Sequence, residues 1–164
     1  MKIQLKNVKI NDSFSEETIC FKADLFVNGK KIAHAENDGR GGCTFIYAYP
    51  EKKSELAEVE KYCKTLPKRV YDFGEFDNDL ESVIEDLLNE KMQEKEQKKI
   101  DKLCLTSIVY GIPGDISYGF IGFKGKPKFE DIKKTAAGQK AIENLVNKVK
   151  AQLGDDQVIF NTNI

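Results

Sequence analysis

Two residue types that can do covalent chemistry lie close together in the sequence: a cysteine within the glycine-rich stretch ENDGRGGCTF, residues 36–45, and the chain's single histidine just before it. A cysteine enzyme needs its thiol within hydrogen-bond reach of a base, and Cys43 with His34 is the candidate pair. The thiol also needs an electropositive setting, which only Arg40 offers nearby. The strand pattern places His34 on the apolar side together with Ile32, where a histidine packs into the core. A cysteine-dependent enzyme is therefore an alternative, and we assign no catalytic residue.

The same stretch does not match a phosphate-binding loop. Such a loop follows a strand, precedes a helix and ends in a Lys-Ser/Thr pair, whereas Gly41-Gly42 here lead into Cys43-Thr44 and a further strand. The asparagine, the aspartate and the three glycines of this stretch tolerate left-handed backbone. We interpret the stretch as a connection between strands, in which Arg40 could contact an anion or a partner.

Cysteine usage and apolar runs limit the cellular setting. The four cysteines are widely spaced, with no pair at metal-ligand spacing, so we expect no metal and no cofactor; they are Cys20, Cys43, Cys63 and Cys104. Scattered cysteines favour a reducing, cytoplasmic location.

Residues 1–10 alternate lysines with aliphatics, unlike a secretory signal. No apolar run approaches the ~20 residues that span a bilayer, so we expect no membrane partner.

Acidic side chains are concentrated in one part of the chain. Eight of them fall within residues 72–90, and no lysine or arginine interrupts the run. They are Asp72, Glu75, Asp77, Asp79, Glu81, Glu85, Asp86 and Glu90. The first turn of a helix favours carboxylates, which explains part of the run. The remainder projects a negative field that could dock onto a positively charged groove, such as one that holds nucleic acid.

Basic side chains gather further along. Residues 122–153 hold eight lysines against three acidic residues. The preceding segment YGFIGF, residues 118–123, resembles the end of the RNA-recognition-motif signature, whose aromatic residues stack on bases. The two positions before it, Ile116 and Ser117, do not match that signature. RNA or single-stranded nucleic-acid binding is therefore a second alternative. The residues that would carry it are Tyr118, Phe120, Phe123, Lys124, Lys126 and Lys128.

The periodicity of apolar residues predicts an α+β fold with a mostly antiparallel sheet packed with about three helices. The 164 residues and 40% hydrophobic content fit a single globular domain over residues 1–164. A net charge of −1 gives the whole molecule no strong pull on nucleic acid. We expect a strand meander over 1–49, turning at Asn28-Gly29, a helical segment with an exposed charged helix over 50–103, and hairpin, helix and strand over 104–164.

The run FKADLFVNGKKIAHAENDGRGGCT and the ending VIFNTNI resemble a group of small uncharacterised bacterial proteins carried by phages and mobile elements. Such elements encode small, folded, non-enzymatic proteins that block host defence nucleases, anti-CRISPR proteins among them. By that analogy we expect an inhibitor of a nucleic-acid-processing defence complex that acts by protein–protein interaction. The acidic run would be its partner-binding surface, with Arg40 assisting.

Overall fold

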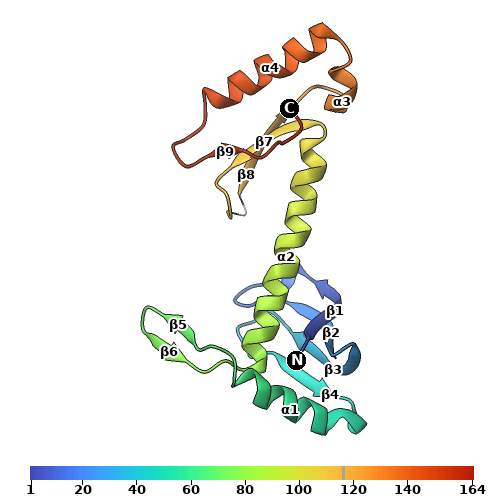
Figure 1. The fold of residues 1–164 in the computed structure, drawn as a ribbon, viewed down its shortest axis with the longest axis vertical. Coiled ribbons are helices and arrows are strands. Elements are labelled where there is room, and N and C mark those ends of the chain that lie inside the picture. The colour runs from blue at the N-terminus through green and yellow to red at the C-terminus, as the bar shows by residue number, and fades with distance from the viewer. Residues whose placement is uncertain (116) are drawn as a thin grey trace. The chain divides into compact units, whose positions relative to one another are not determined.

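A computed structural model of the protein describes residues 1–115 and 117–164 (Figure 1). Helices and antiparallel strands follow one another as an α+β fold requires, so the predicted fold class is confirmed. Contacts within the chain divide it into two compact units, residues 1–91 and 92–164. The expectation of a single domain over residues 1–164 stays a prediction.

A four-stranded antiparallel sheet forms the framework of the first unit, with its strands in sequence order. The strands are β1 (Ile3–Ile10), β2 (Phe21–Val27), β3 (Lys30–Asn37) and β4 (Phe45–Ala48). The meander predicted over residues 1–49 is therefore present. Alternate residues point to the same face of a strand, and the apolar face of this sheet packs on α1 (Lys53–Cys63) and the first half of α2 (Leu80–Cys104).

The turn between β2 and β3 has the predicted form. Asn28 and Gly29 both have positive φ, as a type I′ turn requires, and Val27 pairs with Lys30 across it. The first strand contains an irregularity near Asn7, which has a φ of 52°, and the register between β1 and β2 shifts between Lys6 and Lys9.

A second irregularity changes which residues face the core. Leu25 pairs with Ala33 instead of Ile32, because β3 contains one extra residue at this point, a β-bulge. Ile32 and Ala33 are consequently both buried. The bulge reverses the alternation that follows, and His34 pairs with Asp24 on the face away from the core. The prediction that His34 lies on the apolar side is wrong.

A short hairpin interrupts the helical segment predicted over residues 50–103. β5 (Arg69–Tyr71) pairs with β6 (Gly74–Phe76), and the pair extends away from the four-stranded sheet (Figure 1). Strands of three residues are too short to show an alternation in the sequence. The predicted helices flank this hairpin as α1 and α2, and the charged second half of α2 is largely exposed, as expected.

The second unit, residues 92–164, places a three-stranded antiparallel sheet between helices. Its strands lie in the order β8 (Tyr118–Gly122), β7 (Ser107–Gly111) and β9 (Val158–Ile159). On one side, α3 (Phe129–Ile132) and α4 (Ala136–Lys150) bury Phe129 and Ile142 against Ile108. On the other, the end of α2 buries Ile100 against Val109. The predicted hairpin, helix and final strand are thus present; Ile116 lies outside the described residues.

Among residues 1–115 and 117–164, none of the helices combines the length and the apolar character that crossing a bilayer needs.

Candidate partner-binding surface

Two carboxylates of the predicted acidic surface stabilise the fold. The Asp79 carboxylate accepts a hydrogen bond of 2.7 Å from the backbone N–H of Ser82 and so caps α2. Partial burial opposes ionisation of Asp79, but the hydrogen bonds from Ser82, together with the positive charges of Arg69 and Lys64, outweigh it and lower its pKa. The Glu81 carboxylate accepts a hydrogen bond from the backbone N–H of Thr44, which ties α2 to the residue before β4. Each of these carboxylates therefore has a structural partner within the chain.

Arg69 fastens the base of the β5–β6 hairpin to the first turns of α2. Its guanidinium donates to the backbone oxygen of Ser82 at 2.7 Å, to Asn78 Oδ1 at 3.2 Å and to the carboxylate of Asp86. It also lies 3.4 Å from the Tyr71 hydroxyl. A guanidinium presents several donors in a rigid fork, so one side chain fixes the direction of the hairpin. Asp86 is therefore a third predicted partner contact that has a structural role.

The other five acidic residues of the segment are exposed, and Asp79 and Asp86 are exposed as well despite their contacts. Asp77 lies 3.8 Å from the ammonium of Lys68, and an exposed pair of this kind contributes little stability. The four remaining carboxylates are Asp72, Glu75, Glu85 and Glu90, which we call the exposed acidic set. These four residues are available to meet a positively charged partner.

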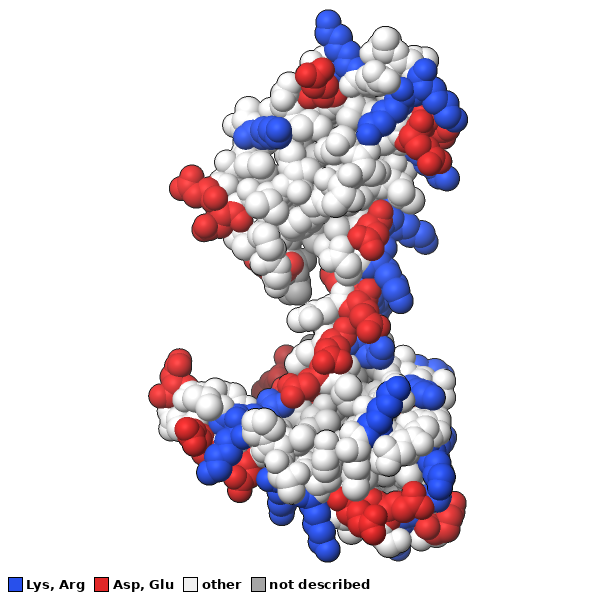
Figure 2. All heavy atoms as spheres, in the orientation of Figure 1, with Lys and Arg blue, Asp and Glu red and all other residues white. Residues whose placement is uncertain are grey.

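The β5–β6 hairpin also carries a cluster of aromatic rings that was not predicted from the sequence. The centroids of Tyr71 and Phe73 lie 5.3 Å apart with nearly parallel rings, and Phe76 lies within 5.8 Å of both. Phe73 is 79% exposed, Phe76 48% and Tyr71 43%. We call these three residues the aromatic tip. In Figure 2 red carboxylates flank the uncharged atoms of this hairpin.

The sequence did contain a signal for this cluster. Aromatic and acidic residues alternate in VYDFGEFDND, residues 70–79. Such a run, held outside the core, places apolar rings and negative charge on the same short element.

An acidic groove of about 510 Å³ lies beside the first turns of α2. Its carboxylates come from two distant segments and are Glu16, Glu17, Asp79, Glu81 and Glu85. Asn37, Gly42 and Thr44 also line it. Glu16 and Glu17 were not predicted as part of the surface, because only the folding of their loop against the glycine-rich stretch brings them here. This concentration of carboxylates extends the negative field around Glu85.

The glycine-rich stretch connects β3 to β4, as interpreted from the sequence. Gly39 has a φ of 86°, and its carbonyl accepts backbone hydrogen bonds from Glu16, Glu17 and Thr18 at 2.9, 3.0 and 3.3 Å. A Cβ at Gly39 would lie 2.1 Å from the backbone oxygen of Phe14, so glycine is required. The side chain of Arg40 is exposed on this loop, and its contact with a partner stays a prediction.

The histidine and the cysteines have ordinary structural settings. His34 is half-buried, with Nδ1 3.5 Å from Asp24 and Nε2 3.7 Å from Glu36, so both ring nitrogens face carboxylates. Cys43 is exposed, whereas burial raises the pKa of the Cys63 and Cys104 thiols and keeps them protonated. Within the part of the chain that the structure describes, no group of three or more His, Cys, Asp or Glu residues has metal-binding geometry.

The residues predicted for nucleic-acid binding are not brought to one face. Phe123 packs edge-on against buried Phe129, with ring centroids 6.2 Å apart, on the α4 side of the sheet. Tyr118 packs on the α2 side and donates a hydrogen bond to Glu96. Phe120 is 55% exposed. The three lysines Lys124, Lys126 and Lys128 are exposed in the segment after β8. Of the three predicted aromatic residues, Phe120 is the one left exposed enough to stack on a base.

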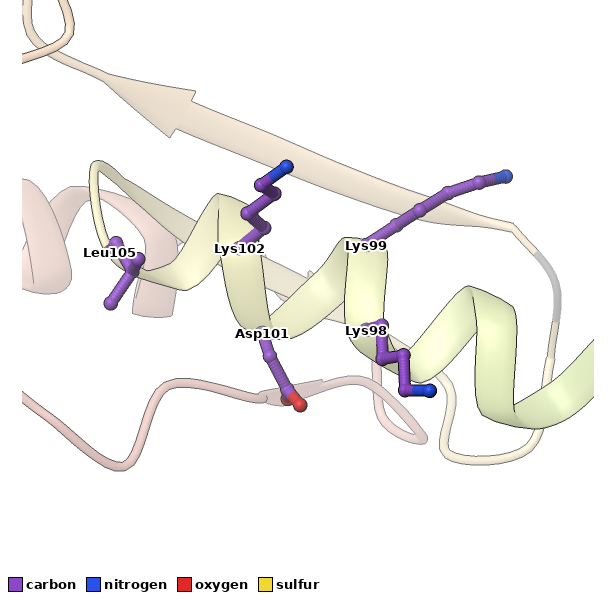
Figure 3. A pocket seen from close by; sticks show the side chains of 5 residues that line it. All are labelled: Lys98, Lys99, Asp101, Lys102 and Leu105. Atoms are coloured by element: carbon purple, nitrogen blue, oxygen red, sulfur yellow. The ribbon is translucent and has the colours of Figure 1, made fainter.

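A second, shallow depression runs along the end of α2 (Figure 3). It measures about 500 Å³ and is bordered by Lys98, Lys99, Asp101, Lys102 and Leu105. These residues all come from the end of α2 and the turn after it, and all are exposed. Lys99 is paired with Glu96 at 2.7 Å, and exposed ammonium groups are strongly hydrated. This depression is therefore a basic helix surface whose lining residues are all exposed.

No protein-family model, curated protein or solved structure matches the chain. Its function is therefore inferred from the residues that the fold leaves exposed.

Proposed function

We propose that the protein is a non-enzymatic binding protein whose exposed acidic set docks onto a basic surface of a protein partner. The basic surface would be one that otherwise holds nucleic acid, so that docking inhibits a nucleic-acid-processing complex of a host defence system. This is the mode of action of an anti-CRISPR-type protein carried by a phage or mobile element. Recognition of this kind needs exposed, prearranged charge and no bond-making group.

The observation that carries the proposal is the division within the acidic segment. Asp79, Glu81 and Asp86 are engaged by Ser82, Thr44 and Arg69, although Asp79 and Asp86 are also exposed. Among the described residues, the four carboxylates of the exposed acidic set face solvent without a contact of this kind. Capping and ion pairing explain the first group only. Four like charges within residues 72–90 repel one another, and a positively charged partner would remove that repulsion on binding.

A comparison of two variants with equal changes in charge tests this proposal. The acidic-set variant carries Asp72→Asn, Glu75→Gln, Glu85→Gln and Glu90→Gln. The control variant neutralises four exposed carboxylates elsewhere, through Glu58→Gln, Glu143→Gln, Asp155→Asn and Asp156→Asn. Both leave the engaged carboxylates intact, so both should fold.

The wild type and both variants are used as bait in a host lysate, with and without nuclease treatment. We expect the wild type and the control to retain the same proteins after nuclease treatment, and the acidic-set variant to lose them. Equal retention by all three would contradict the assigned surface. Retention that depends on intact nucleic acid would instead favour the RNA-binding alternative.

A further inference from the structure

The aromatic tip is an apolar surface held out in water by a short, rigid hairpin. Tyr71, Phe73 and Phe76 contact one another, and each is at least 43% exposed. Isolated exposed apolar residues are normal, but a contiguous group marks an interaction site. Aromatic residues at the centre of an interface supply most of its affinity, because they bury a large area with few rotatable bonds.

The hairpin is already fixed in position before any partner arrives. Arg69 joins it to α2 through Ser82, Asn78 and Asp86. Asn78 also donates to the backbone oxygen of Pro67 at 2.9 Å, which closes the base of the hairpin. A preorganised element loses little conformational entropy on binding, so the rings can act as an anchor.

Charge around the rings restricts what can cover them. Asp77, which follows β6, is paired with Lys68, so the negative charge that remains near the rings comes from Asp72 in the turn of the hairpin and Glu75 in β6. Nucleic-acid phosphates and anionic lipid headgroups would be repelled by these carboxylates. An apolar cleft bordered by lysine or arginine would bury the rings and place positive charge next to the carboxylates.

We propose that the aromatic tip inserts into an apolar cleft, bordered by basic side chains, on the protein partner. This inference rests on the proposed function and adds the chemistry of the partner's surface. The exposed acidic set supplies the charge that orients the encounter, and Phe73 and Phe76 supply the apolar contact that holds the complex together. The affinity for cationic surfaces should therefore depend on apolar groups as well as on charge.

Two synthetic peptides of equal length and equal positive charge test this inference on the full chain. One combines lysines with leucines, and the other has glutamines in place of the leucines. We expect the wild type to bind the lysine–leucine peptide about tenfold or more tightly than the lysine–glutamine peptide. Phe73→Ser and Phe76→Ser should remove this preference and leave the salt dependence of binding unchanged.

The matched control changes another exposed ring pair. Phe45 and Tyr47 stack at 6.2 Å on β4, and each is 52% exposed. Phe45→Ser and Tyr47→Ser should leave the preference for leucine intact. Equal loss in this control would overturn the inference, because any exposed ring would then suffice.

The remaining outcomes separate the two proposals. If the wild type binds both peptides equally and the acidic-set variant binds neither, the anchor is overturned and the acidic surface stands. If the wild type binds neither peptide, both proposals are overturned. A mass in sedimentation that rises with concentration, and no longer does so in Phe73→Ser, would assign the aromatic tip to a second copy of the chain and overturn the cleft.

Discussion

At the scale of single residues, the β-bulge in β3 determines which side chains surround the carboxylate of Asp24. Because the bulge turns His34 outward, its imidazole meets the carboxylate of Asp24 instead of the apolar core. The hydrogen bond of 2.7 Å from the Asn7 side chain is the main cause that lowers the pKa of Asp24. Burial opposes this shift, while Lys31 and His34 assist it.

This setting predicts a pH dependence. A carboxyl group whose pKa is lower in the folded state than in the unfolded state stabilises the fold at any pH above its unfolded pKa of roughly 3.9. This contribution is lost as the pH falls through the folded-state pKa. Asn7→Gly keeps the positive φ of 52° accessible but removes the amide. We expect the pKa of Asp24 to rise in this variant. The measurement is an NMR titration that records the chemical shift of the Asp24 carboxyl carbon as the pH changes. An unchanged titration midpoint would contradict the role of Asn7.

Individual elements divide into those that local patterns predict and those that depend on distant contacts. The Asn28-Gly29 turn, the two helices beside Pro67 and the final strand follow from turn residues and periodicity. The β5–β6 hairpin does not, because each strand has three residues and its position depends on Arg69 reaching α2.

The candidate site divides in the same way. The concentration of acidic residues was visible in the sequence, but the engagement of Asp79, Glu81 and Asp86 was not. Their partners come from α2 itself, from residue 44 and from β5, at sequence separations up to 37 residues. Glu16 and Glu17 join the groove by a similar long-range approach. Local charge pattern can therefore predict where a surface lies and cannot show which of its charges are free.

The role of Arg69 leads to a prediction at this scale. Arg69→Ala removes donors to Ser82, Asn78 and Asp86, and hydrogen bonds from a charged donor contribute about 1.5–3 kcal/mol. We expect amide hydrogen exchange in β5 and β6 to accelerate by at least about tenfold, while exchange in β1–β4 stays slow.

Lys68→Ala is the control for this prediction, since Lys68 makes only an exposed ion pair with Asp77 at 3.8 Å. Its exchange rates should match those of the wild type. Unchanged protection of the hairpin in Arg69→Ala would show that Arg69 does not fix the aromatic tip.

On the scale of the whole molecule, positive and negative charges nearly cancel, but they are distributed unevenly along the chain. The net charge is −1, yet the exposed acidic set lies entirely in the unit of residues 1–91, and the eight lysines of residues 122–153 lie in the other. Long-range attraction of the whole chain to nucleic acid is therefore weak. Recognition then depends on local surfaces, and the exposed acidic set with the aromatic tip combines charge with exposed apolar rings.

The most direct test measures the dissociation constant between this chain and a protein that it retains from nuclease-treated lysate, at low and high salt. We expect the acidic-set variant to bind at least about tenfold more weakly than the wild type at low salt, with a shallower salt dependence. The control variant, with the same change in net charge, should bind as the wild type does. Equal dissociation constants and equal salt dependence for all three proteins would contradict the account.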